Sequence, residues 1–256
     1  MATSIGVSKR PWPHVEIRRV PLLQPVIWLR QGWDDLRFLG WPSIAHGALI
    51  VTMGAVLLSI ASAHLYLVVA AVTGYLLVGP IMTTGLCELS RRRAAREPVG
   101  FDESLQAVTR NPTSLAQFGA VLGVIALLWL VASQATVSSI VHGSSPGWDT
   151  VLWGSFTGAV DRAQAAAYIG SGAILAAIVF ALSVVSVPII IDRDAGATEA
   201  MVASVKTLWH NLPAMLVWSG LIVALTALGF VTLLGMVIVA PLLGHATWHA
   251  YRDMVR

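Results

Sequence analysis

Residues 207–251 read TLWHNLPAMLVWSGLIVALTALGFVTLLGMVIVAPLLGHATWHAY and contain no Asp, Glu, Lys or Arg. A helix needs about 20 mostly apolar residues to cross the hydrocarbon core of a bilayer. This stretch is therefore long enough for two membrane helices with a tight turn between them.

Three more charge-free stretches precede it, at residues 43–87, 113–148 and 163–191. By the same length argument, the first holds two helices and the other two hold one each, which makes six in all. The composition agrees, because 56% of the residues are hydrophobic and 11% are charged, against about 25% charged residues in an ordinary soluble domain. A soluble protein would need polar faces at the helical period, which these segments lack. We expect an all-α polytopic membrane protein with spans near 43–61, 64–87, 114–140, 164–190, 212–230 and 232–250.

The chain divides into a tail and one membrane domain. Residues 1–25 contain four prolines and show no signal-peptide pattern, so they are expected to form an extended cytoplasmic tail. Residues 26–256 are expected to form a single six-helix domain. The only cysteine, Cys87, excludes an intramolecular disulfide and is expected to be a buried, inert thiol.

The basic residues predict the orientation, because Lys and Arg are retained on the cytoplasmic side of a membrane. If the N-terminus is inside, only Arg162 of the 16 Lys and Arg residues falls outside. This split predicts a bacterial inner membrane protein with both termini in the cytoplasm. The pI of 9.4 follows from that topology, and no nucleic-acid partner is expected.

One order of features recurs three times along the chain. A polar amphipathic segment is followed by a proline, an outbound helix, a returning helix with a proline in its last third, and then charged residues. The three segments are WLRQGWDDLRFLGWPS (28–43), DESLQAVTRNPTS (102–114) and TEAMVASVKTLWHNLPA (198–214). They predict a threefold helix-hairpin repeat; the alternative is that prolines and charges simply cluster at membrane boundaries.

The amphipathic segments are expected to lie on the cytoplasmic surface as helices. The expected apolar stripes are Leu29, Trp33 and Leu36 in the first segment, and Met201, Val205, Leu208 and Trp209 in the third. Pro42, Pro112 and Pro213 would end these helices, because the residue before proline is disfavoured in the α region.

Tryptophan recurs near the predicted cytoplasmic boundary. An aromatic belt at the membrane interface is the expected role of Trp28, Trp33, Trp41, Trp209, Trp218 and Trp248.

Four sequence blocks carry a family resemblance: LRQGWDDL (29–36), GPIMTTGLCELSRRR (79–93), IIIDRD (189–194) and APLLGHATWHAYR (240–252). They resemble an uncharacterised proteobacterial family of six-helix integral membrane proteins, a domain of unknown function whose members are sometimes labelled cytochrome c oxidase subunit I. The resemblance implies a six-helix membrane fold without an established activity, and it supplies no catalytic residues.

The histidines exclude the oxidase label for this chain. An oxidase catalytic subunit needs six histidines deep in the membrane, and only seven occur here, of which His14, His142 and His210 are expected in tails or loops. His64 is expected at the outer end of a helix. The remaining three, His46, His245 and His249, are too few for two haems and a copper.

These three histidines are nevertheless the candidate metal ligands. His245 and His249 are four residues apart, so they share a helix face, and His46 could supply a third ligand if the first and last spans are neighbours. No carboxylate except Asp253 is close in sequence to orient the rings. The preferred interpretation is therefore interfacial histidines, with no cofactor bound.

Basic and aromatic side chains are expected to contact anionic lipid headgroups, at about 1 kcal/mol for each charge. The candidates are Arg91, Arg92, Arg93, Arg96, Trp248 and Arg252. Topological anchoring is the alternative role for the arginines, and Glu88 is a candidate ion-pair partner for one of them.

Three functions remain open. The first is a non-enzymatic accessory or structural protein that acts through membrane lipids and other membrane proteins, such as respiratory-complex subunits. The second is a carrier or binder of lipid-like solutes, for which kinks at Pro80, Pro188 and Pro241 would open a central cavity. The third is a metal or haem protein using the three histidines.

Overall fold

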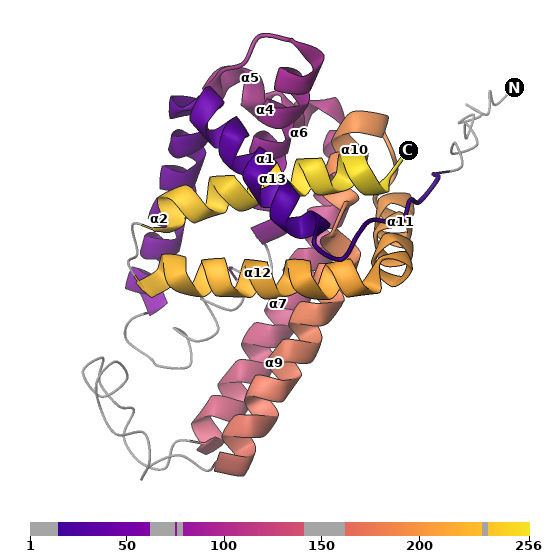
Figure 1. The fold of residues 1–256 in the computed structure, drawn as a ribbon. Coiled ribbons are helices and arrows are strands. Elements are labelled where there is room, and N and C mark those ends of the chain that lie inside the picture. Colours follow the sequence, from indigo (N-terminus) through magenta and orange to yellow (C-terminus); the bar gives the residue numbers. More distant parts are fainter. Residues whose placement is uncertain (1–14, 62–74, 76–78, 141–161, 232–234) are drawn as a thin grey trace, which may run out of the picture.

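The computed structural model describes residues 15–61, 75, 79–140, 162–231 and 235–256, and all regular structure there is α-helical. Figure 1 shows the helices in chain order. They are α1 (Gln24–Leu39), α2 (Trp41–Ala61), α4 (Thr84–Ala95), α5 (Phe101–Leu105), α6 (Ala107–Arg110), α7 (Pro112–Ile140), α9 (Arg162–Ser183), α10 (Ser186–Arg193), α11 (Ala197–His210), α12 (Leu212–Val231) and α13 (Met236–Met254). The expected all-α class is confirmed for these residues.

Four described segments are long and apolar enough to cross a membrane. They are Trp41–Ile60, Pro112–Ser133, Ala166–Arg193 and Leu212–Val231, and they coincide with four of the six predicted spans. The predicted span 64–87 lies largely outside the described residues. The last predicted span corresponds to α13, which does not reach the same apolar composition, so the count of six stays a prediction.

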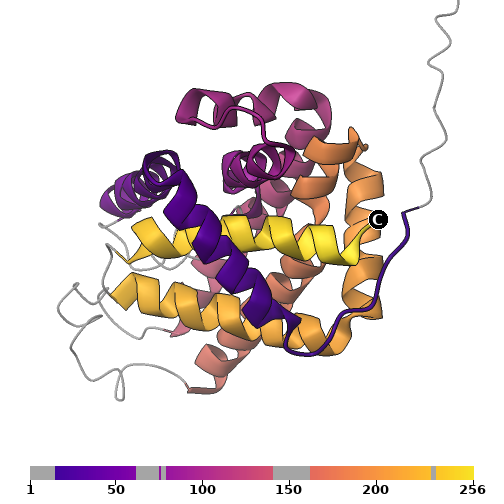
Figure 2. The same ribbon diagram turned by 45° about the horizontal axis from the view of Figure 1, so that its top comes forward.

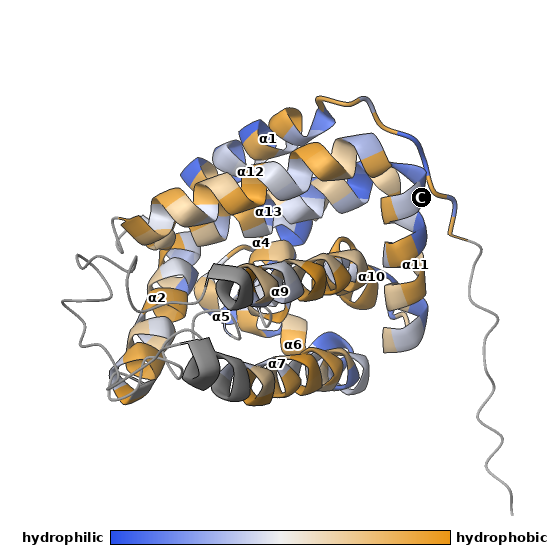
Figure 3. Ribbon diagram, turned by 90° about the horizontal axis from the view of Figure 1, so that it is seen from below, coloured by the Kyte–Doolittle hydropathy of each residue, from blue (hydrophilic) through white to orange (hydrophobic). Residues whose placement is uncertain are grey.

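Prolines begin the outbound helices, as expected. Pro42, Pro112 and Pro213 occupy the first or second position of α2, α7 and α12, where no intrahelical donor is required. In Figure 1 the long antiparallel pair α7 and α9 extends away from the other helices. Figure 3 shows α7 and α9 coloured mainly hydrophobic, whereas the colours alternate along α1 and α11.

The returning helices differ from one another at their prolines. A turn at Val184 and Val185 separates α9 from α10, which contains Pro188, and a turn at Thr83 precedes α4. By contrast, α13 continues through Pro241. Three equivalent kinks are therefore not observed, and the threefold repeat stays a prediction.

Helix α13 is the centre of the packing, since α1, α2, α4 and α12 all contact it. Figures 1 and 2 both show α1 lying across α13. A Cβ atom on Gly32 of α1 would lie 2.8 Å from the backbone nitrogen of Ala246. A Cβ on Gly47 of α2 would lie 2.1 Å from the carbonyl oxygen of Val237. Small residues thus let two helices approach α13 closely, and the expected contact between the first and last spans is confirmed.

The carbonyl that Gly47 contacts is one that proline leaves free. Pro241 has no backbone N–H, so the carbonyl of Val237, four residues earlier, has no intrahelical donor. The missing side chain of Gly47 allows the backbone of α2 to cover this carbonyl. The pairing of a glycine on one helix with a proline on the other explains why the two helices meet there.

Two helices outside the four candidate spans, α11 and α1, each bury one face. Helix α11 buries Ala200, Ala203, Ser204 and Thr207, and exposes 68% of Trp209. Helix α1 buries Trp28, Gly32, Asp35, Leu36 and Leu39. Of the two predicted apolar stripes, Leu36 is buried, whereas Trp33 and Trp209 are exposed. The placement of these stripes on the membrane surface stays a prediction.

The two ends of the described chain pair with each other. Ile17 and Val255 form an antiparallel bridge, and the backbone N–H of Arg18 donates to the oxygen of Met254 at 2.9 Å. Residues 15–23 are extended or turn-like, and the predicted cytoplasmic tail at residues 1–25 stays a prediction. Both ends consequently lie on one face of the molecule.

Candidate functional site

A polar cluster lies where α1, α2, α4 and α13 meet. It consists of Asp35, Ser43, Ser90, His245 and His249, called the Asp35 cluster below. The first four side chains are buried, with Asp35 4% exposed and His245 0% exposed, and the side chain of His249 is 23% exposed. A buried polar group is costly unless it is hydrogen-bonded, so the partners of each atom decide what the cluster does.

The Asp35 carboxylate accepts three hydrogen bonds. Ser90 Oγ donates to Oδ2 at 2.5 Å, Nε2 of His249 lies 2.9 Å from the same oxygen, and Arg93 donates to Oδ1 at 2.5 Å. Burial by itself would raise the pKa of Asp35, but the hydrogen bonds from His249 and Ser90 and the nearby imidazoles outweigh it, so this pKa lies below its ordinary value. The carboxylate therefore holds α1 to both α4 and α13 as an anion.

His245 lies between two serine hydroxyls. Its Nδ1 is 2.8 Å from Ser90 Oγ, and its Nε2 is 2.9 Å from Ser43 Oγ. Because the Ser90 hydroxyl donates its proton to Asp35, it can only accept from His245. The neutral ring consequently carries its proton on Nδ1 and accepts the Ser43 proton at Nε2.

This arrangement is unlike a nucleophilic triad. In a triad one imidazole bridges the nucleophilic hydroxyl and the carboxylate. Here His245 contacts two serines, whereas Asp35 contacts the other histidine. Among the described residues, Gln31 Oε1 is the one buried side-chain polar atom without a hydrogen-bond partner. The hydrogen bonds of the Asp35 cluster therefore connect four helices.

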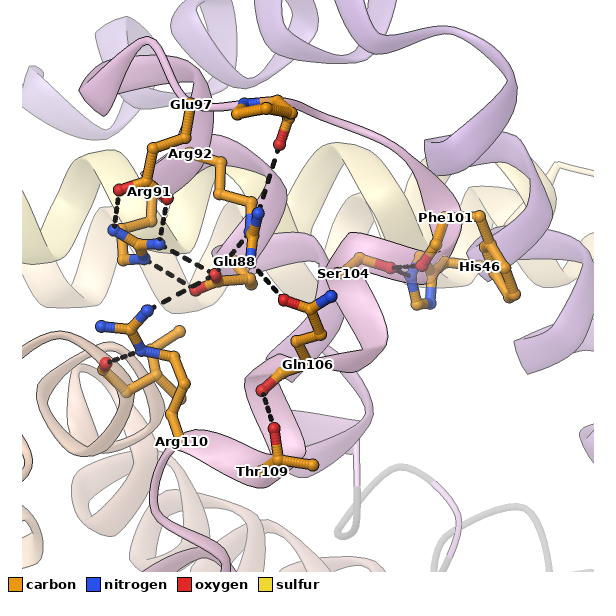
Figure 4. A network of polar contacts seen from close by, with 12 residues as sticks. His46, Glu88, Arg91, Arg92, Glu97, Phe101, Ser104, Gln106, Thr109 and Arg110 are labelled. Carbon is orange, nitrogen blue, oxygen red and sulfur yellow. Dashed lines mark hydrogen bonds and ion pairs between the residues drawn. The ribbon is translucent and has the colours of Figure 1, made fainter.

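A second polar cluster surrounds Glu88 on α4 (Figure 4). Glu88 is fully buried and accepts from Arg91 at 2.7 Å and from Arg92 at 2.8 Å. Arg110, at the end of α6, lies 3.8 Å from the same carboxylate. Arg91 also bonds Glu97 at 2.7 Å. The expected pairing of Glu88 with a neighbouring arginine is thus present, and it compensates a charge that would otherwise be buried alone.

The third candidate histidine, His46, contacts two side chains of α5. Its Nε2 lies 2.7 Å from Ser104 Oγ, and its ring lies 5.0 Å from that of Phe101 between centroids. Figure 4 shows the imidazole between these two side chains of α5. A Cβ on Gly85 would lie 2.5 Å from His46 Cε1, so the glycine makes room for the ring.

The three candidate metal ligands therefore have different partners. His46 bonds Ser104, His245 bonds two serines, and His249 bonds Asp35. Within the described residues, no three His, Cys, Asp or Glu side chains gather in a way that could hold a metal ion. A metal site at these histidines stays a prediction.

Asp35 is a site residue that was not predicted from the sequence. The expectation that no carboxylate other than Asp253 lies near the histidines is wrong, because Asp35 approaches His249 from α1. A signal was available in the spacing of Trp28, Gly32, Asp35 and Leu39, which lie on one helix face and are all buried. The adjacent Asp34 is exposed, so helical periodicity separates the two carboxylates.

The candidate headgroup residues fall into two groups. Arg91, Arg92 and Arg93 direct their guanidinium groups inward to Glu88, Glu97 and Asp35, and Trp248 is 1% exposed. Arg96 and Arg252 are exposed. Headgroup contact stays a prediction for this last pair, and the burial of Trp248 argues against it for that indole.

The burial of three tryptophans also contradicts their predicted place in an aromatic belt. Trp28, Trp218 and Trp248 are at most 1% exposed. Trp28 donates its indole N–H to Asp253 at 2.7 Å and packs edge-on against Trp218 at 5.8 Å. These three belong to the core, because the surface helices cover them. Trp33, Trp41 and Trp209 are exposed and stay candidates for the interface.

Comparison with known proteins adds a family match. Residues 67–192, just under half of the chain, match a family described as predicted integral membrane protein (DUF2189). The range includes the block at 79–93 and the first four residues of the block at 189–194, and it leaves out those at 29–36 and 240–252. No curated protein and no solved structure matches this sequence. The family resemblance seen in the sequence is thereby confirmed: this chain matches, over residues 67–192, an uncharacterised family of predicted integral membrane proteins.

Proposed function

We propose that this chain is a non-enzymatic accessory protein of the bacterial inner membrane that acts by binding other membrane proteins. The observation that carries the proposal is the Asp35 cluster. Its histidines, serines and carboxylate form hydrogen bonds that join α1, α2, α4 and α13, which favours a structural role for them.

The orientation with both termini in the cytoplasm is part of the proposal. Pairing of Ile17 with Val255 supports it, since it brings the two described ends to the same face. The distribution of Lys and Arg favours the cytoplasmic side for that face.

The outer face of α1 is the surface that would contact a partner. Its inner face is anchored by Asp35, and its outer side exposes 52% of Val26, 44% of Trp33 and 65% of Phe38. These residues lie outside the four candidate spans, which favours a protein partner over the bilayer core. Exposed apolar side chains on a rigidly held helix are typical of protein contact sites.

Site-specific crosslinking tests this function. A photoreactive side chain at Val26 or Phe38 in intact membranes should yield a discrete protein adduct, identified by mass spectrometry. The same group at the buried Trp28 is the matched control and should give intramolecular products only. A Trp33→Asp substitution should abolish the adduct. Crosslinks to lipid alone from both exposed positions would contradict the accessory role.

A further inference from the structure

An open groove runs between the N-terminal segment and α11. It is lined by Ile17, Val205, Lys206, Trp209 and His210, and its volume is about 460 Å³. It lies apart from the Asp35 and Glu88 clusters and from the outer face of α1. Of its residues, Trp209 has a role proposed above, at the membrane interface.

The groove combines an apolar wall with a free cation. Trp209 is 68% exposed, and Val205 and Ile17 are half-buried beside it. Lys206 is exposed, and among the described residues it has no carboxylate within ion-pair distance, unlike Arg91, Arg92 and Arg93. An exposed indole next to an unpaired ammonium suits a ligand with an apolar part and a negative charge.

Its position matches the membrane boundary. Trp209 lies three residues before Leu212, where the candidate span of α12 begins. Large apolar residues are exposed on both sides of this corner, at Val202 in α11 and at Leu216 and Val223 in α12. Trp at such a boundary lies at headgroup level, and Lys extends from there to the lipid phosphates.

The charges around the groove favour an acidic lipid. Arg18 and Arg19 directly follow Ile17, and Glu16 is the neighbouring carboxylate. Glu199, two turns before Lys206 on α11, accepts the backbone N–H of Gly196 at 3.1 Å. Positive charge therefore exceeds negative charge around the opening, which attracts anionic headgroups.

We propose that this groove binds the phosphate-bearing headgroup of an acidic phospholipid. Lys206 pairs with the phosphate, His210 is placed to donate a hydrogen bond, and Trp209 packs against the glycerol backbone and upper acyl chain. The apolar wall distinguishes a lipid from a soluble phosphate ion, which would gain nothing from Val205 and Trp209. Lipid binding in this groove does not depend on the accessory function, so a negative crosslinking result would leave it unaffected.

Native mass spectrometry of the full chain, released from nanodiscs, tests the site. The discs contain phosphatidylcholine with a minor fraction of phosphatidylglycerol, and the retained lipids are counted. Lys206→Gln should lower the affinity for phosphatidylglycerol about fivefold, as expected for the loss of one basic contact, and Lys206→Arg should restore it to within about twofold. Trp209→Ala should weaken binding of both lipids.

Matched controls keep the test decisive. Arg30→Gln and Arg37→Gln remove exposed charges on α1, outside the groove, and should leave the affinity unchanged. An unchanged affinity in Lys206→Gln, or an equal loss in Arg37→Gln, would overturn the site. Displacement of the lipid by millimolar inorganic phosphate would show a soluble-anion site instead. Since Lys206 is exposed, its substitution is not expected to unfold the chain, and circular dichroism checks this.

Discussion

The carboxylate of Asp35 lies 2.9 Å from Nε2 of His249, although the two residues are 214 positions apart in the chain. This contact joins the first described helix to the last one. It also places a charged group in a position where burial would be unfavourable without its three donors.

Substitution of Asp35 should therefore destabilise the folded protein. We expect Asp35→Ala to lower the free energy of unfolding by about 3 kcal/mol, because it leaves His249, Ser90 and Arg93 without their common acceptor. Asp34→Ala is the matched control on the exposed side of the same helix and should change it by less than about 0.5 kcal/mol. Denaturation in mixed micelles measures both. Equal effects would show that Asp35 contributes no more than a surface charge.

The Asp35 carboxylate should make the stability of the fold depend on pH. Its pKa in the folded protein is lowered, whereas in the unfolded chain it is about 3.9. The stabilisation is then fully present above pH 4 and is lost as the pH falls through the lower, folded value. The melting temperature of the wild type should decrease more than that of Asp35→Asn between pH 5 and pH 3. Parallel pH profiles would argue against this linkage.

The crossing of α2 and α13 can be tested at Gly47. An added Cβ would lie 2.1 Å from the Val237 oxygen, so Gly47→Ala must push the helices apart, at about 1–3 kcal/mol. Gly54 on the same helix is the control, because its Cβ would lie 3.6 Å from the Tyr75 ring, an ordinary contact. Gly54→Ala should be neutral or slightly stabilising in thermal unfolding. A neutral Gly47→Ala would contradict the close approach.

The topology can be measured with reporter fusions. Fusions after Arg93 and after Arg256 should report cytoplasm, and a fusion near Ser145 should report periplasm, because the charge distribution retains the basic segments inside. A cytoplasmic signal at Ser145 would rule out the six-helix arrangement. Agreement at all three sites would extend the span count beyond the four described helices.

Elemental analysis tests the histidines. We expect no stoichiometric zinc, copper or iron in the purified protein, since each candidate ring is engaged by Ser or Asp side chains. A His245→Ala, His249→Ala double variant should lose stability and show the same metal content. Stoichiometric metal in the wild type that disappears in the variant would establish a metal site.

The membrane class and the boundaries of some helices could be predicted from the sequence. Charge-free stretches predicted spans near 43–61 and 212–230, and α2 and α12 cover nearly the same residues. This succeeds because transfer of apolar side chains into a bilayer depends on local composition. Proline positions also have local consequences, so the starts of α2, α7 and α12 were predictable.

Contacts between distant segments were decided by the tertiary structure. Which of Asp34 and Asp35 is buried, and that Trp28 and Trp248 lie in the core instead of a belt, depends on which face of α1 meets α13. A single sequence contains both faces and does not say which neighbour covers them. Burial and hydrogen bonding arise from packing between residues far apart in the chain, so the sequence by itself determined the helices and the structure determined their partners.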